Sequence, residues 1–215
     1  MNAIIDNADV FLNAWLTTLG LTVSSAAIAL VLGTILAAMR VSPVPVLRGF
    51  ATTYVGIIRN TPAVIMLYFS VFVLPQLGVR ASFFALALIG ISVYYAAFFC
   101  EAVRSGINAV PVGQAEAARS LGLNFPQSLR KVVLPQALRA VVPPLINVFV
   151  AVTRTSAVAG AFGVAELFAT MSRLASLNAS SVILILLTTA VLYLAITIPA
   201  GLAAGQIEKK VRFAR

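Results

Sequence analysis

The sequence predicts an all-α integral membrane protein with five transmembrane helices and one cytoplasmic helix-turn-helix. Three observations support this fold class. Hydrophobic residues make up 61% of the 215 positions and charged residues only 10%, whereas soluble domains carry about 25% charged residues. The apolar residues gather in charge-free runs, and a bilayer crossing takes about 20 such residues. A polar stretch at residues 108–136 interrupts these runs and has the pattern of two short helices.

The charge-free runs divide a single transmembrane domain, residues 1–215, into five spans. Residues 50–58 form an amphipathic lead-in to the second span. No Lys or Arg precedes the first run, whereas a signal peptide begins with a basic segment, so we expect this run to be retained as a span. The five spans are expected at about residues 10–39, 63–77, 82–103, 137–160 and 181–206.

The composition excludes several kinds of site. Cys100 is the single cysteine and the chain has no histidine, so an intrachain disulfide and a Cys/His zinc site are ruled out. Cys100 fits a small apolar position in the core, and we expect no metal and no cofactor. With six acidic residues, none of them closely paired, and no histidine, a membrane enzyme is disfavoured. No GxxxxGK[ST] phosphate-binding loop occurs either.

The net charge of +9 reflects topology. The cations lie at the ends of apolar segments, which is the pattern of the positive-inside rule and not of nucleic-acid binding. With five spans, Arg80 and Arg173 fall on the same side of the membrane as Asp6 and Asp9. The other side of the membrane holds far more cations. We therefore expect the polar stretch and the C-terminus in the cytoplasm and the N-terminus outside. The cations of the cytoplasmic side are Arg40, Arg48, Arg104, Arg119, Arg130, Lys131, Arg139 and four at the C-terminus.

The polar stretch carries the start and stop signals of two helices. The first helix is expected at about 112–121, and Gly122 follows it as the residue best able to adopt a left-handed stop. Asn124 then begins the second helix, with Gln127 three positions later as in a capping box. That helix is expected to end before Pro135, which cannot continue the hydrogen-bond ladder. The alternative is a loop that only connects the third and fourth spans.

The fourth span contains a charge within the membrane. Arg154 lies about 14 residues, or about 20 Å, beyond the start of this span, near Asn147, Thr155 and Ser156. Ionisable residues at such depth usually face a cavity or a partner, and transporters place substrate sites near the midplane. Arg154 is thus a candidate for attracting a substrate carboxylate. Alternatively, it lies near the outer interface or pairs with Glu166 as part of the structure.

The second span opens on Arg59-Asn60-Thr61-Pro62. Pro62 suits the start of a helix, and Asn60 or Thr61 is expected to cap it. A second interpretation gives Asn60 and Thr61 a place in the lining of a pore. Glu101 and Arg104, three residues apart at the end of the third span, form an ordinary interfacial pair in this reading.

The polar stretch resembles the EAA loop of permease subunits in binding-protein-dependent ABC importers. The resemblance is carried by Glu116-Ala117-Ala118, Gly122, Val132 and Leu134-Pro135, which keep the spacing of that loop, with Val132 where isoleucine is usual. Shorter motifs are similar to the polar amino acid branch, and particularly to glutamate-type permeases. These are Met39-Arg40-Val41-Ser42-Pro43, Arg59-Asn60-Thr61-Pro62, Ser105-Gly106-Ile107-Asn108 and Gly113-Gln114-Ala115.

The resemblance implies a type I importer permease of a bacterial cytoplasmic membrane. Its first short helix would be the coupling helix that docks on an ATPase subunit, with Glu116, Ala117, Ala118, Gly122, Leu134 and Pro135 as coupling residues. It implies two cytoplasmic ATPase subunits, a second permease subunit, identical or paralogous, and an external substrate-binding protein. The chain itself would be no enzyme, and it would move a polar amino acid such as glutamate or glutamine by alternating access.

One motif departs from the family pattern. The family usually carries Lys-Asp/Asn-Thr-Ser where this chain has Arg154-Thr155-Ser156-Ala157. The charge at the first position is kept, but the acidic or amide residue is replaced.

The alternative function is an ion-coupled secondary transporter or a channel subunit, although such transporters usually have more spans, internal repeats and intramembrane acids.

Overall fold

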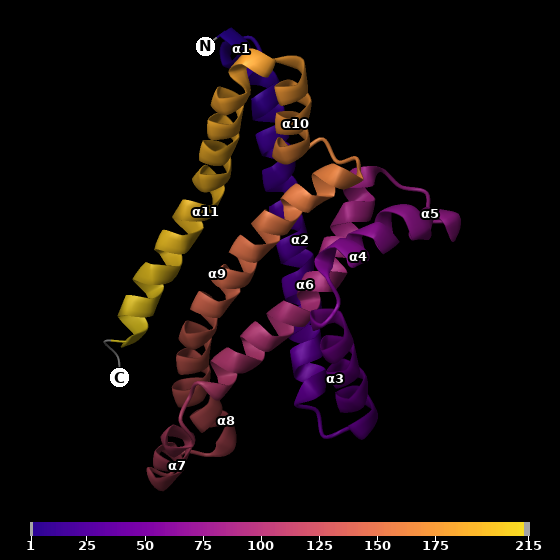
Figure 1. The fold of residues 1–215 in the computed structure, drawn as a ribbon. Helices are drawn as coiled ribbons and strands as arrows, with labels where there is room; N and C mark the ends of the chain where they lie inside the picture. The colour runs from indigo at the N-terminus through magenta and orange to yellow at the C-terminus, as the bar shows by residue number, and fades with distance from the viewer. Residues whose placement is uncertain (1, 213–215) are drawn as a thin grey trace.

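The structure is a computed structural model that describes residues 2–212, and over that range every regular element is a helix. Figure 1 shows long helices running along an elongated molecule, with short helices at both ends. The expected all-α class is confirmed. Four helices are long and apolar enough to cross a bilayer, and a fifth span results if two helices joined by a sharp bend are taken together.

The bent pair lies in the region of the expected second span. Helix α3, Pro45–Arg59, begins with a proline, whose fixed φ suits the first turn. The helical segment Ala63–Gln76 then leaves α3 at an angle of 103°. The expected lead-in at 50–58 is therefore part of a full helix of 15 residues. The elements up to this point are α1, Asn2–Ile5; α2, Ala8–Arg40; α3; α4, Ala63–Tyr68; η1, Phe69–Val73; and α5, Leu74–Gln76.

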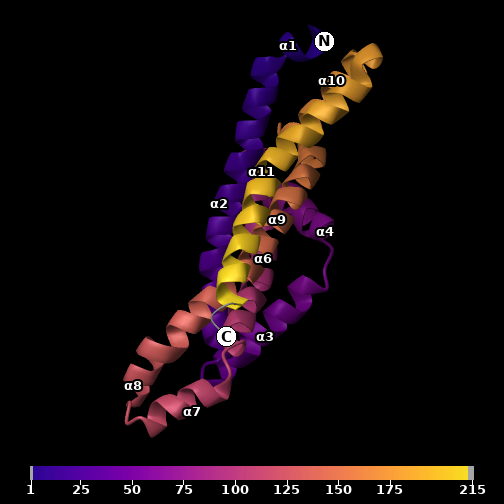
Figure 2. The same cartoon turned by 90° about the vertical axis from the view of Figure 1, so that its left-hand side faces the viewer.

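The remaining elements place the polar stretch at one end of the molecule. Helices α7 and α8 lie at the end opposite to α1 and α10 (Figure 2). The helix that begins at α8 continues through η2 into α9 and is long enough to be one span, Phe125–Phe162. The elements are α6, Phe83–Asn108; α7, Val112–Ser120; α8, Phe125–Ser128; η2, Leu129–Val133; α9, Leu134–Ala159; η3, Gly160–Phe162; α10, Leu167–Leu177; η4, Ala179–Ser181; and α11, Val182–Arg212.

The expectation that a helix ends before Pro135 is wrong. The five residues Leu129–Val133 form a π turn, in which the Leu134 N–H bonds to the Leu129 carbonyl, five residues back. This wider turn accommodates Pro135, since the carbonyl that would clash with its ring in an α-helix is displaced and no N–H is required. The same arrangement precedes Pro75, where the Leu74 N–H bonds to the Phe69 carbonyl.

The core lies where α2, α6 and α9 meet. Leu21 of α2, Ile91 of α6 and Val152 of α9 are at most 1% exposed and belong to one buried cluster. Glycines allow the backbones to approach closely, as small residues do between membrane helices. A Cβ on Gly33 would lie 2.6 Å from the Phe99 Cβ, which shows how near α2 comes to α6.

Among the four long spanning helices, α11 is the least covered, with 17% of its most apolar window buried. It packs on α9 and α10, and the Trp15 Nε1–H of α2 donates a 3.0 Å hydrogen bond to the Leu192 carbonyl. Its outer side chains Ile183 and Val191 are 76% and 62% exposed. Apolar patches of this kind contact lipid or another subunit.

Candidate functional site

The polar stretch folds as a sharply turned helix pair. Helix α7 ends in a Schellman motif: the Leu123 N–H bonds to the Ala118 carbonyl at 3.2 Å and the Gly122 N–H to the Arg119 carbonyl at 2.9 Å. Gly122 has a φ of +82°, a left-handed conformation in which a Cβ costs about 1–2 kcal/mol. The expected stop at Gly122 is therefore confirmed.

The second helix of the pair starts with the expected capping box. The Asn124 side chain accepts from the Gln127 N–H at 3.0 Å, and the Gln127 side chain accepts from the Asn124 N–H at 3.0 Å. These two bonds satisfy backbone donors that would otherwise lack partners at a helix start. From Asn124 the helix runs without interruption through η2 into α9, so α9 and the turn at Gly122 form one continuous segment.

Two contacts join α7 to the spans. Helix α7 packs against η2, and the Gln136 Nε2 donates to the Gln114 Oε1 at 3.3 Å. Close by, α6 and α9 nearly touch, since a Cβ on Gly106 would lie 2.6 Å from the Val141 Cα and 2.7 Å from its nitrogen. The sequence signalled neither the Gln114–Gln136 bond nor the approach of Gly106 to Val141, because each joins residues more than 20 positions apart.

The six residues singled out by the EAA resemblance divide into a buried and an exposed set. Ala118 is 3% exposed and faces the inside of the turn. The other five are exposed: Glu116, Ala117, Gly122 and Pro135, with Leu134 at 45%. Three large apolar side chains also lie open on this pair of helices: Val112 at 74%, Leu121 at 83% and Phe125 at 64%.

The polar residues of α9 point in different directions. Arg154 and Asn147 are exposed and, seven positions apart, share one face of the helix. The Thr155 hydroxyl instead shares a 2.6 Å hydrogen bond with the Tyr95 hydroxyl of α6. Ser156 is fully buried, donates to the Thr153 carbonyl at 2.8 Å and accepts from Thr22 of α2 at 3.5 Å. Of the four residues of α9 that the sequence placed in the substrate pathway, Arg154 and Asn147 are therefore open to a ligand and Thr155 and Ser156 are not.

Glu166 does not pair with Arg154. Its carboxylate is fully buried and caps α10, accepting from the Phe168 N–H at 2.9 Å and the Ala169 N–H at 2.7 Å. The Tyr193 hydroxyl of α11 donates to the same carboxylate. Burial raises the pKa of the Glu166 carboxyl, although these hydrogen bonds act in the opposite direction. Among the side chains that the structure describes, no ion pair joins the Arg154 guanidinium to an acid.

Asn60 and Thr61 end one helix instead of starting the next, which corrects the expected cap. The Asn60 Nδ2 donates to the Gly56 carbonyl at 2.7 Å, and the Thr61 Oγ1 donates to the Ile57 carbonyl at 3.0 Å. Both bonds satisfy carbonyls in the last turn of α3. The residue that precedes α4 is Pro62, with no side-chain cap. Carbonyl groups at the end of α3 accept these side-chain donors because the chain turns by 103° and the helix does not continue.

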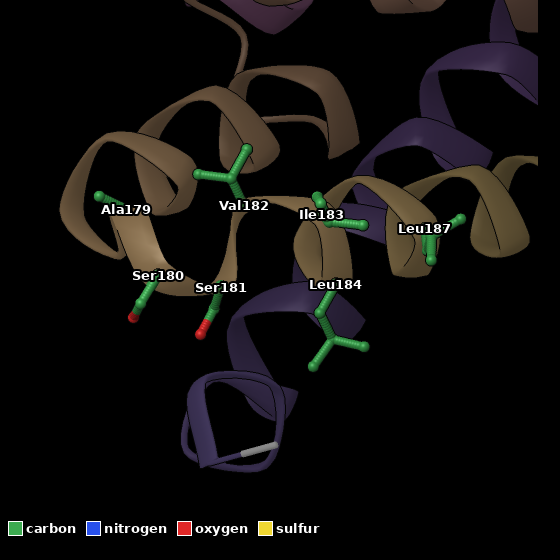
Figure 3. Close-up of a pocket in the computed structure, with 7 residues that line it drawn as sticks. All are labelled: Ala179, Ser180, Ser181, Val182, Ile183, Leu184 and Leu187. Atoms are coloured by element: carbon green, nitrogen blue, oxygen red, sulfur yellow. The ribbon is translucent and has the colours of Figure 1, made fainter.

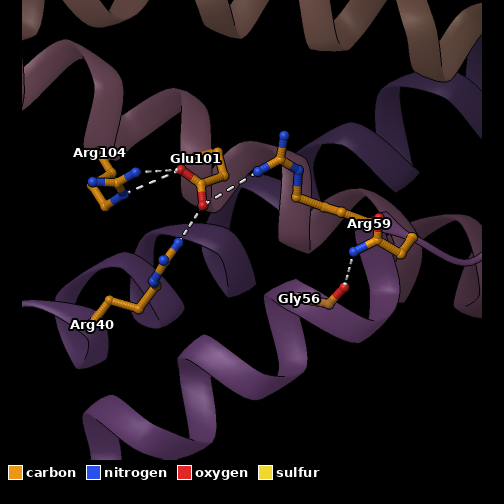
Figure 4. Close-up of polar contacts among 6 residues, drawn as sticks. Arg40, Gly56, Arg59, Glu101 and Arg104 are labelled. Atoms are coloured by element: carbon orange, nitrogen blue, oxygen red, sulfur yellow. Dashed lines mark hydrogen bonds and ion pairs between the residues drawn. The ribbon is translucent and has the colours of Figure 1, made fainter.

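Glu101 is part of a cluster larger than the expected pair (Figure 4). Its Oε2 accepts from the Arg104 Nε at 3.1 Å and Nη2 at 2.9 Å, as expected. Its Oε1 in addition accepts from Arg40, the last residue of α2, and lies 3.4 Å from an Nη1 of Arg59. The Arg59 guanidinium also lies over the Phe98 ring, 5.8 Å from its centroid. Arg40, Arg59 and Glu101 line a recess of about 420 Å³.

A second recess, of about 350 Å³, lies where η4 leads into α11 (Figure 3). It is lined by the contiguous residues 179–184 together with Leu187, of which only Ser180 and Ser181 have polar side chains. Because one short segment forms it and none of the side chains lining it is charged, this recess has the features of a surface turn.

Curated relatives resemble the chain over nearly its whole length. It is 41% identical over 212 residues to the glutamate transport system permease protein GluC of Corynebacterium efficiens, with 93% of each chain covered. It is 32% identical to the probable glutamine ABC transporter permease protein GlnM of Bacillus subtilis, with 98% of this chain and 97% of that protein covered.

Solved structures share the fold. A chain from the crystal structure of an amino acid ABC transporter with histidines superposes with a TM-score of 0.87 at 27% identity, covering 96% of both chains. A chain of the MetNI methionine ABC transporter superposes with a TM-score of 0.72 at 22% identity, which shows the fold alone. Residues 11–213 match the family described as "Binding-protein-dependent transport system inner membrane component". The chain therefore belongs to the family of inner membrane components of binding-protein-dependent transport systems.

Proposed function

We propose that the chain is the permease subunit of an ATP-driven importer that moves polar amino acids of the glutamate or glutamine type by alternating access. The observation that carries this proposal is the continuous segment from the turn at Gly122 through η2 into α9, in a chain 41% identical to a glutamate permease. A permease needs such a segment because force applied at a soluble partner must reach the spans.

Helix α7 is the proposed contact with the motor. Val112, Leu121 and Phe125 are each more than 60% exposed, and a docked ATPase subunit would bury them. Glu116 and Ala117, also exposed, lie on the same helix. The Gln114–Gln136 bond and the close approach of Gly106 to Val141 would carry a displacement of α7 into both α6 and α9.

The proposed pathway passes the open face of α9. Arg154 and Asn147 lie about 10 Å apart along the axis, at 1.5 Å per residue. Arg154 has no acidic partner among the described side chains, so its charge is available for a cargo carboxylate. Asn60 is also exposed and stays in the proposed pathway, whereas the Thr155 and Ser156 hydroxyls hold α9 against α6 and α2.

The proposed assembly contains two copies of the ATPase, where ATP is hydrolysed, a second permease subunit and an external substrate-binding protein. The α7 end, which gathers most of the cations, would face the cytoplasm and the N-terminus the outside. A second permease is required because five helices enclose too little space for a gated pathway. Exposed apolar faces such as that of α11 leave area for this contact.

Reconstitution in liposomes tests the proposal. Permease, ATPase subunits and binding protein are assembled, and uptake of labelled glutamate and glutamine is followed with ATP or a non-hydrolysable analogue inside the vesicles. We expect uptake only with all components and ATP, and competition by unlabelled polar amino acids. Uptake by the permease alone, driven by an ion gradient, would instead indicate a secondary transporter and refute the proposal.

A further inference from the structure

The cluster around Glu101 carries more positive than negative charge. Three guanidiniums, from α2, α3 and α6, contact one carboxylate. Among the side chains that the structure describes, no second carboxylate pairs with these arginines. The other described acids belong to other segments: Asp6 lies between α1 and α2, Asp9 in the first turn of α2, Glu116 in α7 and Glu166 directly before α10. The cluster therefore has two uncompensated positive charges.

The geometry assigns those charges to the recess. Arg104 holds Glu101 by two hydrogen bonds and does not line the recess, so it neutralises the carboxylate from outside. Arg40 and Arg59, which do line the recess, are the surplus cations. The Arg59 side chain is 46% exposed and its nitrogen lies 3.4 Å from the carboxylate. It is thus loosely held and able to contact a ligand.

The recess has the size and lining of an anion site. Its volume of about 420 Å³ falls in the range of about 300–1,000 Å³ usual for ligand pockets. Two guanidiniums and the Thr52 hydroxyl offer hydrogen-bond donors, whereas the Asn60 amide at the edge of the recess already donates to the Gly56 carbonyl, and Phe98 forms part of an apolar wall. Guanidinium groups bind phosphate oxygens by paired, charge-assisted hydrogen bonds.

The position of the recess distinguishes a lipid from the transported cargo. Arg40 is the last residue of α2, so the cluster lies at the end of a span, at the level of lipid headgroups, whereas transporters hold cargo near the midplane. Basic pockets between membrane helices are a known mode of headgroup binding.

We propose that the recess between α2, α3 and α6 binds the phosphate of an anionic phospholipid, with Arg40 and Arg59 as its ligands. Glu101 positions the two guanidiniums and does not contact the phosphate. The inference concerns this recess alone and holds whichever cargo the protein carries.

Native mass spectrometry of the permease–ATPase complex, purified in mild detergent with phosphatidylglycerol added, tests the assignment. We expect wild type and Arg59→Lys to retain the lipid and Arg59→Gln to bind it about fivefold more weakly, the effect of losing one cation near an anionic surface. Arg48→Gln is the matched control, because Arg48 lies on the same helix, donates to the Ser42 carbonyl at 3.4 Å and is not among the residues that line the recess. It should retain the lipid.

Three results would overturn the proposal. The first is an equal loss of lipid in Arg59→Gln and Arg48→Gln. The second is that the wild type retains phosphatidylcholine as well as it retains phosphatidylglycerol. The third is displacement of phosphatidylglycerol by millimolar inorganic phosphate or glutamate. The last result would assign the recess to a free anion or to the cargo. If Arg59→Gln does not assemble, Thr52→Leu serves instead, because it fills the recess without changing charge. Unchanged lipid retention in Thr52→Leu would equally overturn the proposal.

Discussion

Replacing Gly106 by alanine tests how α6 is held against α9 beside the polar stretch. The added Cβ would lie 2.6 Å from the Val141 Cα, and ordinary contact begins at 3.4 Å, so the helices must separate by about 0.8 Å. The obstacle is backbone, which cannot rotate away. Overpacking of this kind costs about 1–3 kcal/mol, and for a chain of this size that lowers the melting temperature by about 2–12 °C.

Gly20→Ala is the matched control for Gly106→Ala. Gly20 also lies within a spanning helix, but its Cβ would meet nothing within 4 Å. Both variants gain about 1 kcal/mol of helix propensity, so their difference isolates the clash. Thermal unfolding of the detergent-purified permease measures stability, and the ratio of ATP hydrolysed to amino acid imported measures coupling. We expect Gly106→Ala to be less stable and to hydrolyse more ATP per transport event. Equal stability and coupling in the two variants would refute the close contact of α6 with Val141.

Three further predictions follow from the same structure. Gly122→Asp should insert and fold but lose transport, as a membrane fractionation and an uptake assay would show. Gly78→Asp, at a similar open position with φ +94°, should keep both membrane insertion and transport. Arg154→Gln should raise the KM for glutamate by about 10-fold or more, because one charge-assisted hydrogen bond is lost. Arg139→Gln on the same helix is the control. If the two variants have the same uptake kinetics, Arg154 does not bind the carboxylate of the cargo. Glu166→Gln should destabilise the fold by about 1–3 kcal/mol, because one buried N–H loses its acceptor. Burial raises the pKa of Glu166, so the contribution of this carboxyl to stability is present at low pH and falls as the pH rises through that pKa. The free energy of unfolding, measured against pH, should show this decline in wild type and not in Glu166→Gln.

Signals that act between neighbouring residues were read correctly from the sequence. The capping box of Asn124 and Gln127 and the left-handed stop at Gly122 both formed as expected, because each depends on hydrogen bonds within one or two turns. The all-helical class followed from long apolar runs, in which only a helix satisfies the backbone inside a bilayer.

Two local readings were wrong, because each depended on how the chain continued. Pro135 stops an α-helix, but the preceding π turn shifts the hydrogen-bond register and the helix passes through it. Asn60 and Thr61 are good caps for a following helix, yet the chain bends by 103° after α3, and both side chains turn back to donate to carbonyls in its last turn. In each case the sequence offers two local solutions, and the geometry of the neighbouring segment selects one.

The membrane class, the helix pair at the α7 end and the resemblance to importer permeases could all be predicted from the sequence, since composition, helix caps and the EAA spacing are local properties. Which polar side chains remain open to a ligand depends instead on how the helices pack. This packing turned Thr155 and Ser156 into contacts between helices, and it brought Arg40, Arg59 and Glu101 together from three separate helices. Such a charge cluster is set by helix packing over as many as 61 residues of sequence separation, a distance over which no spacing rule operates.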